Sequence, residues 1–202
     1  MLDLEKRTPE QEQTAKNALK DEKLLSELLE SMVSTDRERR YQCFKVVYLL
    51  SEDHPEVLYP KWDYFKEMLE SKNSAFTFQA IHILANLAKV DAENKFEQSF
   101  GSFYRFLNGE ELIPASHVAI VSNKIVRAKP ELADAVTARL LNLDKATYKH
   151  KELVQAEALK SISEFFDKVS EKKQVVALAR ELQKNRGRAK SEASAFLKKW
   201  NL

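Results

Sequence analysis

The sequence is poor in glycine, proline and cysteine. Glycine occurs three times in 202 residues, at positions 101, 109 and 187, and proline occurs five times. Glycine-rich phosphate loops need several glycines close together, so the common nucleotide-binding loops are excluded. Cys43 is the only cysteine, which excludes an intrachain disulfide and zinc sites made of paired thiolates. We expect Cys43 to be a small buried residue on a helix.

Long apolar runs are absent as well. Nothing approaches the ~20 consecutive apolar residues that span a membrane, and the first residues, MLDLEKRTPEQ, lack the apolar segment of a secretory signal. Together with the single cysteine, these absences predict a cytoplasmic protein with no membrane partner. Charged residues make up 32% of the chain, and Leu, Ala, Lys and Glu are plentiful, which favours an all-helical domain.

Residues 54–90 contain a pattern that recurs along the chain. Trp62, Phe65 and Leu69 lie at helical spacing on one face of a first helix. After a polar turn in which Asn73 or Ser74 can cap the next helix, residues 76–88 form a second helix that is apolar on most sides. A helix of this kind packs between two neighbours.

The spacing of the apolar residues repeats with a period near 38. Phe65, Phe103 and Leu140 recur at intervals of 38 and 37 residues, and Leu49, Leu87, Val126 and Phe165 recur at 38, 39 and 39. A fixed period of this size is typical of a solenoid, in which each unit buries its apolar faces against the next. Thr8, Pro9 and Gln11 predict an additional helix before the first unit.

With two helices per period and a proline early in the first helix, the chain resembles the HEAT and armadillo-type helical repeats. The resemblance covers roughly residues 21–200, and Asp36 with Arg37 or Arg40 matches the turn of a HEAT unit. It implies an all-α fold: a right-handed α-solenoid (α-α superhelix) of about five HEAT-like helix pairs with an extra N-terminal helix. We expect a single domain, 1–202, with pairs at approximately 21–53, 54–90, 91–128, 129–170 and 171–202.

The sequence offers little catalytic chemistry. No histidine is followed by glutamate, although repeated His-Glu pairs carry the iron of HEAT-like hydroxylases, so that activity is not expected. His82 and His117 lie about one repeat apart; a metal pair or proton relay is the alternative to two isolated polar residues. We predict a protein that is not an enzyme and that binds no metal and no small-molecule cofactor.

The resemblance implies that the second helices line a concave surface that binds another protein or peptide. By position, the candidate partner-binding residues are Gln79, His82, Asn86, His117, Lys124, Arg127, Glu157, Lys160 and Glu164. Their amides and mixed charges favour a non-catalytic scaffold or adaptor. An ordinary solvated face is the alternative.

The C-terminal end is basic. Residues 172–202 carry nine Lys or Arg and two Glu, a net charge of +7 against +2 for the whole chain, which leaves −5 for the rest. The candidate phosphate contacts are Arg180, Lys184, Arg186, Arg188, Lys190, Lys198 and Lys199. Nucleic-acid binding, resembling the helical-repeat proteins of DNA alkylation repair, is therefore the alternative function.

Overall fold

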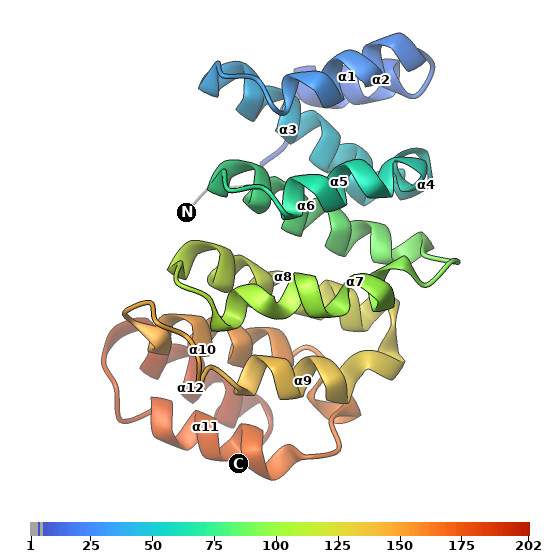
Figure 1. Cartoon of the computed structure of the whole chain (residues 1–202). Coiled ribbons are helices and arrows are strands. Elements are labelled where there is room, and N and C mark those ends of the chain that lie inside the picture. The colour runs from blue at the N-terminus through green and yellow to red at the C-terminus, as the bar shows by residue number, and fades with distance from the viewer. Residues whose placement is uncertain (1–3, 5) are drawn as a thin grey trace. The chain divides into compact units, whose positions relative to one another are not determined.

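The computed structural model describes residue 4 and residues 6–202. Within these residues the chain consists of α-helices and short 3-10 helices, with no strand (Figure 1). The prediction of an all-α fold is therefore confirmed.

The chain divides into two compact units, Met1–Val90 and Asp91–Leu202. The division falls at the predicted boundary between the second and third helix pairs. Each unit has its own apolar core: Trp62, Phe65 and Phe44 are fully buried in unit 1, and Phe96 and Phe103 in unit 2. That the two units form one domain stays a prediction.

Unit 1 is built around α3, which packs against α1, α2 and α6, while α5 packs against α6. Its elements are α1 (Pro9–Ala18), α2 (Glu22–Ser31), α3 (Arg37–Asp53), α4 (Pro55–Leu58), η1 (Tyr59–Lys61), α5 (Trp62–Leu69), α6 (Ser74–Leu87) and η2 (Ala88–Val90).

Local sequence explains where the helices of unit 1 begin. Thr8 and Gln11 form the predicted capping box at α1, and the Asn73 side chain accepts from the Ala75 amide at the start of α6. Pro60 lies in η1, between α4 and α5. Because proline has no amide hydrogen to donate, the first helix of this pair is divided rather than continuous.

Unit 2 is built around α10, which packs against α8 on one side and α12 on another, and also contacts α9 and α11. Its elements are α7 (Lys95–Tyr104), η3 (Arg105–Asn108), α8 (Leu112–Ala128), η4 (Pro130–Leu132), α9 (Ala133–Leu141), α10 (Lys151–Ile162), η5 (Phe166–Lys168), α11 (Lys172–Leu182) and α12 (Gly187–Lys199).

Two turns of unit 2 differ in their use of glycine. Gly187 has a φ of +60° at the start of α12, a left-handed conformation that glycine adopts without steric cost. The sequence Asn108-Gly109 predicts a left-handed cap at Gly109 for the helix before it, but Gly109 is extended, with φ −92° and ψ −158°. The prediction for Gly109 was wrong because the helix before it ends in η3, whose tight turn already closes with the bond from the Gly109 amide to the Phe106 carbonyl.

Side-chain hydrogen bonds connect successive helix pairs within each unit. In unit 1 the Tyr64 hydroxyl donates to the Leu29 carbonyl at 2.7 Å, across 35 residues. In unit 2 the Tyr148 hydroxyl donates to the Leu107 carbonyl at 2.8 Å, across 41 residues. These separations are close to the period of the apolar pattern. The hydrogen bonds therefore connect the same neighbouring helix pairs that the apolar faces connect.

A buried ion cluster lies where α7 meets the end of α8. The Lys129 ammonium lies 3.2 Å from Asp91 and 2.7 Å from Glu97, and the Asp91 side chain is completely buried. Asp91 also accepts from the Lys95 and Phe96 amides at 2.9 Å each and so caps α7. Burial lowers the pKa of Lys129, but its bonds to Glu97 and Asp91 outweigh this effect and the pKa is raised overall.

We expect Lys129→Met to destabilise the protein by about 3 kcal/mol, because it leaves the buried Asp91 carboxylate without its cation. The measurement is the free energy of unfolding from urea denaturation. Lys168→Met, which removes an exposed lysine of the same unit, is the matched control and should change stability by less than about 0.5 kcal/mol. Equal effects of the two substitutions would mean that the ion cluster does not stabilise α7.

Candidate functional site

The three candidate residues on α6 lie inside unit 1 rather than on an open face. Gln79, His82 and Asn86 are only 3%, 5% and 0% exposed. The Asn86 amide donates to the Ser51 hydroxyl at 2.8 Å, and the His82 ring lies 4.9 Å from the Phe78 ring, centroid to centroid. That these side chains bind a partner stays a prediction, and in the structure His82 and Asn86 pack within the unit. Gln79 is buried as well.

The candidate residues on α8 differ in their exposure. Arg127 is exposed, whereas His117 and Lys124 are half-buried. Burial lowers the pKa of His117 to about 4, so this side chain is neutral at physiological pH. Of the three, Arg127 is the side chain that α8 presents most openly.

The candidate residues on α10 meet the basic residues of α12. Glu157 is 5% exposed, and its carboxylate lies 2.5 Å from the Arg188 guanidinium. Burial raises the pKa of Glu157, while Arg188 and Lys160 oppose the shift. Just beyond the end of α10, Glu164 pairs with Lys199 at 3.0 Å.

These two ion pairs connect residues that the sequence assigned to separate sites. Glu157 and Glu164 belong to the predicted partner-binding set, and Arg188 and Lys199 belong to the predicted phosphate-contacting set. The structure brings the four side chains together on the α10–α12 face, which we define as Glu157, Lys160, Glu164, Arg188 and Lys199. Opposite charges separated by 31 and 35 residues were the signal in the sequence that could have revealed this pairing.

The other basic residues remain exposed. All seven of the predicted phosphate contacts lie at the surface, but Arg188 and Lys199 are paired with glutamates. Arg180 and Lys184 line one hollow of about 580 Å³, together with Ala177, Glu181 and Asn185. The positive charge of this end is therefore divided between a hollow beside α11 and a mixed-charge face on α12.

Neither tryptophan offers a flat aromatic surface to a nucleic-acid base. Trp62 is 2% exposed. Trp200 is half-buried, with its ring 5.0 Å from that of Phe166, centroid to centroid. Cys43, expected to be a small buried residue, is partly exposed on α3. Within the part of the chain that the structure describes, no three His, Cys, Asp or Glu side chains converge in a group suited to a metal ion.

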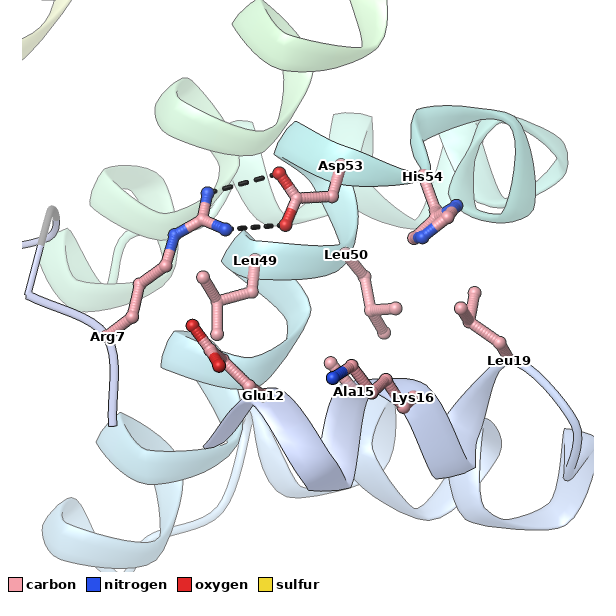
Figure 2. A pocket seen from close by; sticks show the side chains of 9 residues that line it. All are labelled: Arg7, Glu12, Ala15, Lys16, Leu19, Leu49, Leu50, Asp53 and His54. Carbon is pink, nitrogen blue, oxygen red and sulfur yellow. Dashed lines mark hydrogen bonds and ion pairs between the residues drawn. The ribbon is translucent and has the colours of Figure 1, made fainter. Parts of the chain in front are cut away.

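Unit 1 also contains a cavity that the sequence did not suggest. It measures about 280 Å³ and lies between α1 and the end of α3 (Figure 2). Arg7 binds Asp53 through both terminal nitrogens, at 2.6 and 3.1 Å, and the buried Lys45 ammonium donates to the Leu4 and Lys6 carbonyls at 3.2 and 2.8 Å. Arg7 and Lys45 thus hold the N-terminal segment against α3. No local motif marks them, because each pair joins residues about 40 positions apart.

No protein-family model, curated protein or solved structure matches the chain. None of the helices in the described residues combines the length and the hydropathy that crossing a bilayer requires.

The pKa of His117 predicts a pH dependence of stability. Its value is about 4 in the folded protein and 6.5 for an ordinary histidine, so between these values the unfolded chain binds a proton that the folded state does not. Stability therefore falls as pH falls through this window and is fully present above it. Because the ring is only half-buried, we expect His117 to account for a loss of about 1–2 kcal/mol on acidification from neutral pH.

Urea denaturation at several pH values measures this loss. His117→Gln should flatten the acid limb of the stability profile. His150→Asn is the control, because His150 is exposed and left-handed, with a φ of 61°, a conformation that asparagine tolerates. A His117→Gln profile that superposes on the wild-type profile would contradict the assignment.

Proposed function

We propose that this protein is a non-catalytic adaptor of the HEAT or armadillo type, whose helix pairs form a right-handed solenoid and whose second helices bind another protein. Within that surface, the α10–α12 face is the proposed partner-binding site. No cofactor takes part in this function. The single observation that carries the proposal is the arrangement of α8, α10 and α12 as neighbours in one layer.

The packing in unit 2 supports the repeat architecture. α10 contacts both α8 and α12, while α9 and α11 contact α10 and each other. Successive second helices are thus neighbours, and so are successive first helices. Unit 1 has a similar arrangement, because α3 packs against α6. This is the packing in which each helix pair buries its apolar faces against the next pair.

The charges of the α10–α12 face favour a protein partner. Lys160 is exposed beside the pair that the buried Glu157 forms with the exposed Arg188, and the exposed Glu164–Lys199 pair lies beyond it. A face that holds acidic and basic groups side by side weakens the uniform positive potential that a phosphate backbone requires. It suits a protein segment that carries both signs of charge, since complementary charges fix the register and the choice of partner.

Site-specific photocrosslinking tests the adaptor function. A photoreactive amino acid at position 160 should crosslink one discrete protein in an extract of the source organism, and excess unmodified protein should suppress the product. The same group at the exposed Lys173 of α11 is the control and should give little product. Digestion with nuclease should leave the crosslinked band unchanged.

The charge-reversal variant Lys160→Glu provides a second test of the α10–α12 face. It should compete at least about tenfold less well than wild-type protein, because it places a third acidic group beside Glu157 and Glu164. Equal crosslinking at positions 160 and 173, or a product that disappears with nuclease, would reject the adaptor function at this face.

Nucleic-acid binding is the second candidate function, and the hollow beside α11 favours it. Arg180 and Lys184 line this hollow, and Arg186 is exposed in the turn that precedes α12. Three cations within seven residues of the sequence are able to follow a phosphate backbone. A nucleic acid would therefore contact this turn, and the paired residues Arg188 and Lys199 would contribute less to its binding.

Fluorescence anisotropy with labelled duplex DNA at a series of salt concentrations tests this alternative. If the turn contacts phosphates, the triple variant Arg180→Gln, Lys184→Gln, Arg186→Gln should reduce the slope of log affinity against log salt by up to about 3. The control removes three exposed lysines of unit 1, Lys20, Lys61 and Lys66, and changes the net charge equally. No binding at low salt, or equal slopes for the two variants, would eliminate the nucleic-acid function.

A further inference from the structure

A second cavity of unit 2 lies between η3, the adjoining residues of α7, and the end of α9. Its volume is about 470 Å³, and its lining residues are Gly101, Tyr104, Arg105, Asn108, Ala138, Arg139, Asn142 and Lys145. None of these residues belongs to the α10–α12 face or to the basic C-terminal end. The cavity is therefore a separate feature of the molecule (its helices are labelled in Figure 1).

All the charged residues that line the cavity are positive. Arg105, Arg139 and Lys145 contribute three positive charges, Asn108 and Asn142 contribute amides, and no carboxylate is among the residues that line the cavity. The chain as a whole carries nearly as many acids as bases, 31 against 33. A concave region whose charged lining residues are all cations has a positive potential, which attracts anions.

The two arginines lie against aromatic rings. The Arg139 guanidinium carbon is 5.7 Å from the centroid of the Phe100 ring, and that of Arg105 is 4.8 Å from the Phe106 ring. Contact with an aromatic face restricts the orientation of a guanidinium. The cations at this cavity are thus partly positioned before any ligand binds.

Hydrogen bonds from the Asn108 side chain fix the backbone at the third cation, Lys145. The Asn108 amide donates to the Asn142 carbonyl at 2.9 Å, and its oxygen accepts from the Lys145 backbone amide at 2.9 Å. Asn108 therefore fixes the turn from residue 142 to residue 145 against η3. This turn places Lys145 and Asn142 at the same cavity as Arg139.

Gly101 leaves one wall of the cavity open. It lies inside α7 with helical backbone angles, and a Cβ atom built on it meets no other atom within 4 Å. Glycine inside a helix costs stability relative to other residues, and neither a turn nor a crowded neighbour requires it here. What the missing side chain provides is space in the cavity, next to Ala138.

From these observations we propose that this cavity is a binding site for an organic phosphate. The phosphoryl group is bound by the Arg139 guanidinium and the Lys145 ammonium, with the Asn142 amide as a further donor and Arg105 contributing positive potential. The organic part of the ligand lies over Gly101 and Ala138. A volume of about 470 Å³ is larger than inorganic phosphate requires, whereas a phosphorylated small molecule can fill it.

Titration of ¹⁵N-labelled protein with phenyl phosphate, followed by two-dimensional NMR, tests the site. The chain has only three glycines, whose amide signals lie in a separate region of the spectrum, so each is easily followed. Gly101 should shift in a saturable manner, while Gly187 in α12 should not and serves as the internal control. Inorganic phosphate should bind more weakly, and phenol, which lacks the charge, should produce no saturable shift.

Three variants then distinguish the cavity from general charge attraction. Arg139→Gln and Lys145→Gln should each weaken phenyl phosphate binding at least about tenfold, because each removes a charged donor to the phosphoryl group. Lys149→Gln is the matched control: Lys149 is an exposed lysine of the same loop that does not line the cavity. Its affinity should remain within about twofold of wild type.

Gly101→Leu tests the cavity without removing a charge. The leucine side chain should occupy the open wall and abolish binding, while the Tm stays at or above the wild-type value because leucine favours helix more than glycine does. Lack of saturable binding, equal losses for Lys149→Gln and Lys145→Gln, or full affinity in a folded Gly101→Leu variant would overturn the proposal. Inorganic phosphate binding as tightly as phenyl phosphate would overturn the assignment of an organic ligand.

Discussion

The rest of the structure depends on burying helices that are apolar around most of their circumference. In α6, every residue from Thr77 to Leu87 is buried, and α10, which packs between α8 and α12, buries seven of its twelve residues. No such helix is stable in water by itself, because its apolar surface must be covered on more than one side. The first helices, with one apolar face each, complete the covering and leave their polar faces to solvent.

This burial also determines what polar side chains on the second helices can do. A buried polar group in such a helix needs a hydrogen-bond or ion-pair partner, because a buried group without one costs ~1–3 kcal/mol of stability. Asn86 meets Ser51 on α3, and Glu157 meets Arg188 on α12, so both partners come from adjacent second helices. Polar residues that the predicted solenoid would present to a partner are, at these positions, part of the internal contacts of each unit. Of the predicted partner-binding residues, Arg127, Lys160 and Glu164 are the exposed ones.

The sequence predicted the elements of this fold well because local chemistry specifies them. Thr8 and Asn73 have the side chains that cap a helix, and the apolar spacing of Phe65 and Phe103 places both in the cores where the structure has them. The details that depend on neighbours in space were not predictable in this way. Gly109 is extended although its sequence suits a left-handed cap, and the burial of His82 depends on rings from α3 and from its own helix.

At the candidate sites, too, contacts between residues distant in sequence were not predictable. Seven basic residues were recognised from composition, and all seven are exposed. The pairing of two of them, Arg188 and Lys199, with Glu157 and Glu164 depends on the distance between α10 and α12. Arg139 and Lys145, at the cavity beside Gly101, lie in no charge run and match no motif. Periodicity identifies which residues face inward, whereas the alignment of side chains on neighbouring helices decides which outward-facing residues act together.

The separation of the residues joined by side-chain hydrogen bonds has a kinetic consequence. Bonds such as Tyr64–Leu29, Asn86–Ser51 and Tyr148–Leu107 close loops of 35, 35 and 41 residues, each a small part of the 202-residue chain. The entropy lost in closing a loop grows only slowly with its length, but the rate of folding depends strongly on how far apart contacting residues are in sequence. Each unit can therefore assemble through a succession of short loop closures. Nascent helix pairs can find their neighbours during synthesis, before the end of the chain has emerged from the ribosome.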